Sequence, residues 1–359
     1  MVYKASELEL NKLMTLVLER GGSDLHLIAG EPPVIRVDGK LLKLDEYQVL
    51  NIEAVQGIVD VLLNSKQKEQ LEKQMDIDLS YSFKDDARFR INVYKQKGLL
   101  AAAFRLIPNQ IKTVAELGLP ETLLKFTLPK QGLLLVVGPT GHGKSTAMAA
   151  LTDYINKTRA EHIVTIEDPI EYVFKSGLSI VNQREVYVDT PSFGQALKAA
   201  LREDLNVVLV GEMRDLESIQ SVITIAETGH LVFATLHTND AAQSIDRILD
   251  VFPPHQQSQV KAQLASILLG VVSLRLLPKI GGGRVPAYEI MLANNAVRNI
   301  IREGKTYEID NTIQTNLEDG MVSLDRSLAG LVRTGQVAIE DAQAYVKDLQ
   351  YFSSLISKG

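Results

Sequence analysis

The sequence of 359 residues contains no cysteine, and this absence excludes several kinds of site. Without thiols the chain cannot form disulfides, thiolate zinc sites, iron–sulfur clusters or a cysteine nucleophile. Long apolar runs are also missing, because runs such as residues 133–137 fall far short of the roughly 18 residues that a membrane-spanning helix needs. The N-terminus lacks the basic-then-apolar layout of a signal peptide. We therefore expect a cytoplasmic protein that does not insert into a membrane.

The sequence also has no excess of positively charged residues. The 38 Lys and Arg residues stand against 44 Asp and Glu residues, which gives a formal net charge of −6. This balance disfavours binding to nucleic acid or to an anionic lipid surface. The hydrophobic share of 45% and the charged share of 23% are typical of a folded globular protein. At about 150 residues per domain, the length predicts two or three domains.

Residues 1–112 have the pattern of a small α+β domain. Apolar residues at helical spacing predict a first helix that ends at Gly21-Gly22 and a second at residues 52–62, and Ser65 is expected to cap a third. Asp38-Gly39 between two apolar stretches predicts a hairpin turn. Strands are expected at residues 25–28, 34–37, 41–44, 77–83 and 89–93.

Beyond a linker at about residues 108–120, continuous apolar strands alternate with helices, which predicts an α/β domain with a parallel sheet covered on both faces. Its strands are expected at residues 133–137, 163–166, 207–210 and 231–236. From about residue 258 onward we expect mainly helices, on the helical spacing of Leu264, Ile267, Leu268, Val271 and Leu274. This second domain is assigned to residues 113–359, with a helical C-terminal part at about 292–359.

The segment Gly138-Pro-Thr-Gly-His-Gly-Lys-Ser145 fits the phosphate-binding pattern G-x-x-x-x-G-K-[ST]. Its glycines allow several backbone N–H groups to face phosphate oxygens at the positive end of the following helix. Lys144 would reach the β- and γ-phosphates, and the Ser145 hydroxyl would bind Mg²⁺. The residues expected to bind ATP are Thr140, Gly141, His142, Gly143, Lys144, Ser145 and Thr146.

Two expected strands of this sheet end in acidic residues, Glu167 after residues 163–166 and Glu212 after residues 207–210. Because the carboxyl ends of parallel strands meet at one edge, both carboxylates should lie beside the P-loop. There they could complete the Mg²⁺ shell, as we expect of Glu212, or polarise the attacking water. The alternative is that they only cap the following helices, as Asp215 is expected to do.

Histidines and arginines supply further candidates. His230 and His237 flank the last expected strand, and each could be structural, or His237 could sense the γ-phosphate; no set of ligands accompanies the pair to favour zinc. In the first domain, Arg88, Arg90 and Arg105 lie among alternating residues. They could form a solvated strand face, or they could reach the nucleotide of a neighbouring subunit and neutralise its phosphate charge.

Together these motifs resemble the type IV pilus retraction ATPases, the PilT group of the secretion ATPase superfamily, over nearly the whole chain. The four ATPase signatures of that family appear in order, as the P-loop at 138–145, an aspartate box at 166–171, a Walker B segment at 208–215 and a histidine box at 228–237. A further segment looks like the retraction motif AIRNLIRE with two conservative changes; it comprises Ala296, Val297, Arg298, Asn299, Ile300, Ile301, Arg302 and Glu303. His142 stands where the family usually has serine.

The resemblance implies a PAS-like N-terminal domain, a RecA-like ATPase domain and a homohexamer in which ATP and Mg²⁺ bind between the two domains of each chain. It also implies roles for individual residues. They are activation of water for Glu167, the Walker B role for Glu212, nucleotide sensing for His230 and His237, and contacts from the N-terminal domain for Arg88, Arg90 and Arg105.

The implied function is ATP hydrolysis coupled to pilus retraction, that is, to pilin depolymerisation and twitching motility. The motor would act from the cytoplasm through an inner-membrane platform protein of the pilus machinery. Replacing Arg298 is then expected to spare ATP hydrolysis and to abolish retraction.

Other functions stay open on the sequence alone. One is an accessory retraction ATPase or an extension ATPase of the same superfamily, although the absence of cysteines and the segment 296–303 argue against extension. Another is a scaffold that binds ATP without hydrolysing it, which the paired carboxylates disfavour. A nucleic-acid translocase would share the ATPase core, but the acidic charge balance counts against it.

Overall fold

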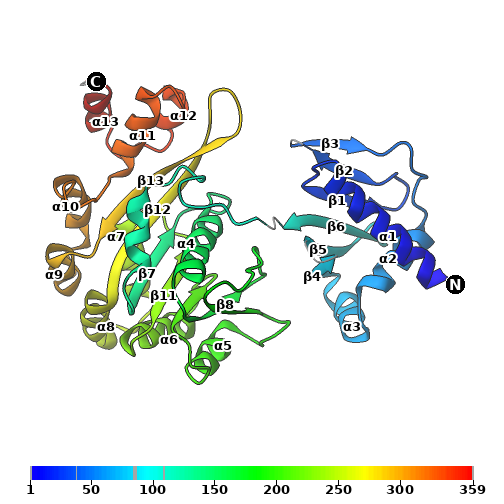
Figure 1. The fold of residues 1–359 in the computed structure, drawn as a ribbon, viewed down its shortest axis with the longest axis horizontal. Coiled ribbons are helices and arrows are strands. Elements are labelled where there is room, and N and C mark those ends of the chain that lie inside the picture. Colours follow the sequence, from blue (N-terminus) through cyan, green and yellow to red (C-terminus); the bar gives the residue numbers. More distant parts are fainter. Residues whose placement is uncertain (1, 38, 84–86, 108–109, 358–359) are drawn as a thin grey trace. The chain divides into compact units, whose positions relative to one another are not determined.

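The computed structural model describes residues 2–37, 39–83, 87–107 and 110–357, and it divides into two compact units, Met1–Gln110 and Ile111–Gly359 (Figure 1). The first unit comprises α1 (Val2–Glu19), β1 (Asp24–Ile28), β2 (Val34–Val37), β3 (Lys40–Lys43), α2 (Ile52–Leu62), α3 (Ser65–Gln74), β4 (Asp76–Phe83), β5 (Ala87–Gln96) and β6 (Leu99–Ile107). This is the small α+β fold that the alternating pattern predicts.

The six strands of the first unit form one antiparallel sheet in the order β3-β2-β1-β6-β5-β4. Alternate residues of β5, namely Phe89, Ile91 and Val93, are buried and pack in one core with α1 and α2. The strands that flank Asp38-Gly39 pair as a hairpin, as expected, although Asp38 itself lies outside the described residues.

The predicted cap of α3 is off by one residue. Asn64 caps the helix, because its Oδ1 accepts from the N–H of Gln67 at 2.9 Å, and the Gln67 side chain accepts from the N–H of Asn64 at 3.0 Å. Such a reciprocal pair satisfies two N–H groups that the first helical turn leaves free. Ser65 is therefore the first helical residue and not the cap.

The second unit is built around strands and helices in alternation. In chain order they are η1 (Glu121–Thr127), β7 (Gly132–Val137), α4 (Lys144–Thr158), β8 (His162–Glu167), β9 (Ile180–Glu185), α5 (Phe193–Ala200), β10 (Val207–Val210), α6 (Leu216–Glu227), β11 (Leu231–Leu236), α7 (Ala241–Asp250), α8 (Pro254–Ile267), β12 (Leu268–Pro278) and β13 (Arg284–Leu292).

The seven strands of this unit form one sheet in the order β13-β12-β7-β11-β10-β8-β9. All neighbours pair in parallel except β13, which runs antiparallel to β12 at the edge. Leu133 and Leu135 of β7 pack with α5 to α9 on one face, whereas Leu134 and Val136 pack with α4 and η1 on the other. The predicted parallel sheet with helices on both faces is therefore present.

One prediction for this unit is wrong. Residues 268–274, expected to continue a helix, belong to β12, because α8 ends at Ile267 and the next residues pair with β7. Burial of Leu268, Val271 and Leu274 suits a central strand as well as a helix, since both of its faces are covered. Hydrophobic spacing alone cannot distinguish these two solutions.

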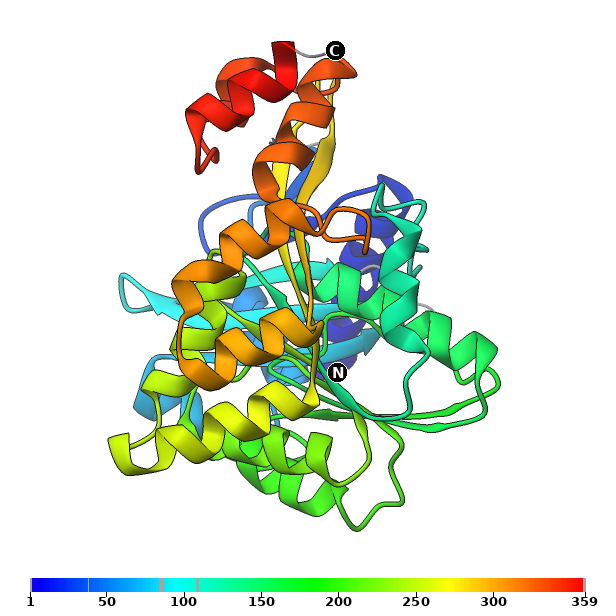
Figure 2. The same cartoon turned by 90° about the vertical axis from the view of Figure 1, so that its left-hand side faces the viewer.

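The C-terminal part is helical, as expected. It comprises α9 (Asn295–Glu303), η2 (Thr306–Glu308), α10 (Ile309–Thr315), α11 (Leu324–Arg333), α12 (Ile339–Gln343) and α13 (Leu349–Ser357). Figure 2 shows α11 to α13, in orange and red, gathered at one end of the β12–β13 ribbon, where Leu277 and Ala287 join their core. Among the residues that the structure describes, no helix has the length and apolar character to cross a membrane.

Candidate functional site

The P-loop follows the carboxyl end of β7, and its conformation depends on glycine. At Gly138 the backbone has φ +142°, and an added Cβ would lie 2.6 Å from the carbonyl oxygen of Leu274 on β12. Gly141 and Gly143 also have positive φ, at +79° and +87°. Because Gly143 has no side chain to cap α4, the first N–H groups of the helix remain available to an anion.

The side chains of the loop surround this helix end. Lys144 is buried, and its Nζ donates to the carbonyl oxygens of Gly138 at 2.7 Å and Pro139 at 2.9 Å. Burial lowers the pKa of Lys144. Ser145 lies half-buried in the first turn, and Thr146 Oγ1 lies 2.8 Å from the hydroxyl of Tyr172. The ammonium group thus lies within the loop, which suits a group that neutralises phosphate.

Glu167 is the last residue of β8, and it is only 7% exposed. One carboxylate oxygen accepts from Thr165 Oγ1 at 2.7 Å and from Gln183 Nε2 at 3.4 Å, and the other accepts from the N–H of Glu171 at 3.4 Å. Burial nevertheless raises the pKa of Glu167 to about 7. A carboxyl group with this pKa and a fixed orientation is suited to general-base chemistry near neutral pH.

A chain of polar contacts joins the P-loop to Glu212. Thr140 Oγ1 lies 3.3 Å from Nδ1 of His237, and Nε2 of His237 lies 3.3 Å from Oε1 of Glu212. Oε2 of Glu212 accepts from Nε of Arg214 at 2.8 Å, and Arg214 lies 3.9 Å from Asp168. The structure therefore brings the loop, the histidine and both acidic strand ends together.

Strand order explains this convergence. Val210 of β10 pairs with Ile166 of β8 on one side and with Ala234 of β11 on the other, while β11 pairs with β7. The residues that follow these strands therefore meet at one edge, as predicted. Gly211, which follows β10, has little room for a side chain on the side of β8, since an added Cβ would lie 3.2 Å from Cα of Glu167.

His230 lies away from this edge. It precedes β11, at the amino end of the sheet, where its Nδ1 lies 3.0 Å from the carbonyl oxygen of Ile225. His237 follows at the other end of β11, seven residue steps away, which correspond to about 23 Å at 3.3 Å per residue. The structure thus does not bring His230 to the P-loop of its own chain, in contrast to the expectation that both histidines sense the nucleotide.

The ring of His142 contacts β12 and Tyr345. Its Nδ1 accepts from the N–H of Leu276 on β12 at 2.9 Å, which makes Nε2 the protonated nitrogen of the neutral ring. Burial, followed by the charges of Arg275 and Lys144, lowers the pKa of His142. His142 therefore contributes its backbone to the phosphate loop and its neutral side chain to packing.

The three arginines of the first unit share one face of its sheet. Arg90 of β5 lies directly across from Arg105 of β6. Arg88, two residues earlier in β5, lies on the same face, opposite the buried residues. Arg105 Nε lies 3.0 Å from Asp24, and Arg90 lies 3.6 Å from Asp78. The structure places these three side chains on one face of the sheet. That they contact the nucleotide of another subunit remains a prediction.

The segment 296–303 forms most of α9, and its exposed and buried sides differ. Val297, Ile300 and Ile301 are buried in the core of the second unit, whereas Ala296, Asn299, Arg302 and Glu303 are exposed. Arg298 is half-buried, and its structural role is not evident from the sequence. Its guanidinium donates to carbonyl oxygens at and beyond the end of α8, namely those of Ala265, Ser266 (2.7 Å) and Leu268 (3.0 Å), and to that of Ala293 (2.8 Å).

Replacing Arg298 by alanine is expected to lower the free energy of unfolding by about 2–3 kcal/mol, because the carbonyl groups at the end of α8 lose a charged donor. Arg302 is the matched control, since it lies on the exposed side of α9 and donates to Asn299 within the same helix at 2.8 Å. Its replacement should cost less than about 0.5 kcal/mol. Urea denaturation of both variants measures the difference, and equal stabilities would contradict the capping role of Arg298.

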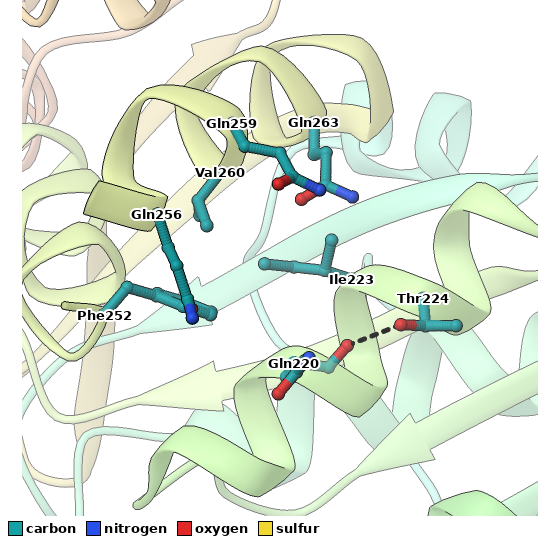
Figure 3. A pocket seen from close by; sticks show the side chains of 8 residues that line it. All are labelled: Gln220, Ile223, Thr224, Phe252, Gln256, Gln259, Val260 and Gln263. Carbon is teal, nitrogen blue, oxygen red and sulfur yellow. Dashed lines mark hydrogen bonds between the residues drawn. The ribbon is translucent and has the colours of Figure 1, made fainter. Parts of the chain in front are cut away.

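A pocket of about 230 Å³ lies elsewhere on this unit, between α6 and α8 (Figure 3). Its rim carries Gln220, Gln256, Gln259 and Gln263, and Phe252 lies at one side. All of its lining side chains are uncharged, and α6 and α8 cover the face of the sheet opposite to α4. This pocket is therefore not the phosphate site.

Several residues of the site are not evident from the sequence. Tyr172 contacts the P-loop helix, Arg214 neutralises Glu212, and Gln183 reaches Glu167 from β9. Tyr172 directly follows the acidic segment 166–171 and Arg214 follows Glu212 by two, so proximity in sequence could have suggested both. Gln183 comes from the pairing of β8 with β9, which no local pattern indicates.

Comparisons with known proteins identify relatives of this chain. A family model described as "Type II/IV secretion system protein" matches residues 4–282. A protein of Pseudomonas aeruginosa named "Type IV pilus retractation ATPase PilT" is 46% identical over 340 residues, which cover 95% of this chain and 98% of that protein. From the same organism, "Type IV pilus ATPase PilU" is 37% identical and is covered to 92%.

A solved structure is also similar. The "Crystal Structure of the Pilus Retraction Motor PilT and Bound ADP" is 46% identical in sequence and superimposes with a TM-score of 0.90, over 96% of this chain and 98% of that one.

Proposed function

The chain belongs to the type II/IV secretion system protein family, and from this membership we propose that it is an ATPase that drives retraction of type IV pili. The predicted resemblance to the pilus retraction ATPases is confirmed by the relatives and by the similar structure. That structure carries ADP, which supports nucleotide binding by this chain. The observation that carries the proposal is the convergence of Lys144, Glu167, Glu212 and His237 at one sheet edge.

In the proposed reaction, water attacks the γ-phosphorus of ATP bound at the P-loop, the bond from this phosphorus to the bridging oxygen of the β-phosphate breaks, and ADP and inorganic phosphate leave. The loop N–H groups and the Lys144 ammonium hold the phosphates and stabilise the charge that develops on them. Glu167 orients the water and accepts its proton, because its carboxylate is already held by Thr165 and Gln183. His237 lies between Thr140 and Glu212, where it senses the γ-phosphate.

The donor set also suits Mg²⁺. The Ser145 hydroxyl and the Glu212 carboxylate are oxygen ligands, which this cation prefers, and Glu212 is close enough to Lys144 to interact with its charge. When bound, Mg²⁺ neutralises phosphate charge. Ser145 and Glu212 would hold it, and Arg214 orients the Glu212 side chain for that purpose.

Membership of the family supports a proposal for assembly and partners. The proposed motor is a homohexamer in which Arg88, Arg90 and Arg105 reach nucleotide, and it acts on a PilC-type platform protein from the cytoplasmic side of the inner membrane. The role of the exposed side of α9 in retraction belongs to the same proposal. An accessory retraction role is the alternative, and the test in cells described below distinguishes the two.

The pH dependence of hydrolysis tests the role of Glu167. Because burial raises its pKa to about 7, the carboxylate needed as a base forms only as the pH rises through this value. We expect kcat to fall about tenfold per pH unit below about pH 6 and to level off above about pH 8. Phosphate release across this range measures the profile, and a flat profile would remove Glu167 as the base.

Retraction itself is tested in cells. When the protein is deleted, pili should remain extended and twitching should stop, and the intact chain should restore both. A chain with Glu167→Gln should restore neither. Normal twitching in the deletion strain would contradict a primary retraction role and would favour the accessory one.

A further inference from the structure

Lys347, in the turn between α12 and α13, lies among three carboxylates. Its Nζ lies 3.0 Å from Glu289 of β13, 3.1 Å from Asp310 of α10 and 3.2 Å from Asp240, which precedes α7. Asp310 is half-exposed, whereas the side chains of Glu289 and Asp240 are 2% and 11% exposed. Lys347 is therefore the cation for two buried carboxylates from distant parts of the chain.

Both buried carboxylates hold the beginning of α7. Oδ1 of Asp240 accepts from the N–H of Gln243 at 2.8 Å, and Oε1 of Glu289 accepts from the N–H of Ala241 at 3.0 Å. In each case Lys347 contacts the other oxygen of the same carboxylate. The first turn of α7 is thus held by two acceptors that share one cation.

Asp240, the cap of this helix, follows His237 by three residues. The intervening Asn239 is also held, because its carbonyl oxygen accepts from Ser273 Oγ and from Arg275, each at 2.8 Å. Since His237 touches Thr140 of the P-loop and Glu212, the position of its backbone determines whether these contacts form. The support of α7 is therefore also the support of His237.

Lys347 is itself firmly placed. Oδ1 of the buried Asp325 accepts from the N–H of Lys347 at 2.8 Å, and Oδ2 accepts from the N–H of Asp348 at 3.0 Å. Two residues earlier, the ring of Tyr345 packs edge-on against that of His142, with centroids 6.1 Å apart. This turn therefore contacts the P-loop as well as the support of α7.

The two buried carboxylates, Glu289 and Asp240, are stabilised by the positive charge of Lys347. Burial raises the pKa of Glu289, and the nearby negative charge of Asp240 adds to this effect. Burial alone would lower the pKa of Lys347, but the carboxylates of Glu289, Asp240 and Asp310 together raise it above its usual value. Without Lys347, the two buried carboxylates at the start of α7 would lose the cation that contacts both of them, and only the charge of Arg275, which also acts on Glu289 and Asp240, would remain to balance them.

We propose that Lys347 is a positioning residue for ATP hydrolysis, which holds the start of α7 through Glu289 and Asp240 and so keeps His237 in contact with Thr140 and Glu212. This inference rests on the proposed ATPase function. It gives the C-terminal helices a part in the nucleotide site of their own chain. Removal of the cation should impair turnover more than nucleotide binding, because the P-loop and Lys144 stay in place.

Three variants of the full chain test the proposal by ATPase kinetics. Lys347→Met should lower kcat at least tenfold while the KM for ATP changes by less than about twofold. Lys347→Arg, which keeps the charge, should recover most of the loss. Lys198→Met is the matched control, because Lys198 forms an exposed pair with Glu217, and it should leave kcat unchanged.

A fourth variant guards against misfolding. Adding Glu289→Gln to Lys347→Met removes one buried charge but keeps an oxygen for the N–H of Ala241, so the double variant should fold and regain much of the lost kcat. An unchanged kcat in folded Lys347→Met would overturn the proposal. A double variant that folds but regains nothing would overturn it as well.

Hydrogen exchange separates this proposal from the ATPase function. In Lys347→Met, the peptide covering the start of α7 should exchange faster than in the parent chain, and in Lys198→Met it should not. If the parent chain released no phosphate, the proposed function would fail while the exchange result still tested the contact. Unchanged exchange at α7 in Lys347→Met would overturn the positioning role whatever the activity.

Discussion

Replacing Glu167 by glutamine is expected to lower kcat for ATP hydrolysis roughly 100-fold or more, while ATP binding is nearly unchanged. The amide has the size of the carboxylate but cannot accept the proton of the attacking water. The phosphate contacts come from the P-loop and Lys144, which the substitution leaves intact. Single-turnover hydrolysis and ATP titration of the variant measure the two effects separately.

Glu217→Gln is the matched control, because Glu217 is exposed and pairs with Lys198 on the surface. It should keep full activity. If Glu167→Gln hydrolysed ATP at the rate of the parent chain, Glu167 would have no role in catalysis. If it lost ATP binding instead, its role would be structural.

Stability gives a second readout for Glu167. Its pKa in the folded chain is raised to about 7 from an unfolded value of 4.5, so the folded state binds the proton more tightly and loses stability as the pH rises between these values. Removing the carboxylate should therefore stabilise the chain at about pH 8, by up to about 3 kcal/mol, and should change little at about pH 4. Thermal unfolding at both pH values tests this sign.

Replacing Lys144 by alanine is expected to remove both binding and turnover. Loss of the ammonium should weaken ATP binding by more than about tenfold and lower hydrolysis by roughly 100- to 1,000-fold, because the phosphate charge loses its buried counter-ion. Added ATP should raise the melting temperature of the parent chain but not that of the variant.

Lys157 provides the control on the same helix. It lies in the last turn of α4, where it is exposed and pairs with Asp153 at 2.6 Å. Lys157→Ala should keep the ATP-induced rise in melting temperature and the hydrolysis rate. An undiminished ATP response in Lys144→Ala would contradict the assignment of the P-loop as the nucleotide site.

Much of the fold was predictable because its strongest signals are local. The strands β7, β8, β10 and β11 are continuous apolar runs that end in glycine or charged residues, and such runs can be read directly. Strand β12 was missed because Leu264, Ile267 and Leu268 continue one helical spacing across the end of α8. Only the pairing of β12 with β7 decides in favour of a strand, and pairing is not a local property.

The candidate site likewise has one part that local sequence patterns predict and another that depends on contacts between distant segments. The sheet-edge rule, which needs only strand direction, predicted that Glu167 and Glu212 lie at one edge, and the structure places both strand ends there with His237 beside Glu212. It could not supply Gln183 from β9, the cap that Arg298 places on α8, or Lys347 beside Asp240, because these contacts join segments distant in sequence. His230 illustrates the opposite case, where a motif position implied a role that the amino end of β11 does not support.

Mg²⁺-dependent phosphate release from ATP by the purified full chain, measured over a range of protein concentrations beside Glu167→Gln, tests the proposed motor function. We expect that the parent chain releases phosphate, that activity per subunit rises as rings assemble and then saturates, and that the variant releases almost none. ATP binding by the parent chain without phosphate release would contradict this function and would leave a nucleotide-binding scaffold in place of a motor.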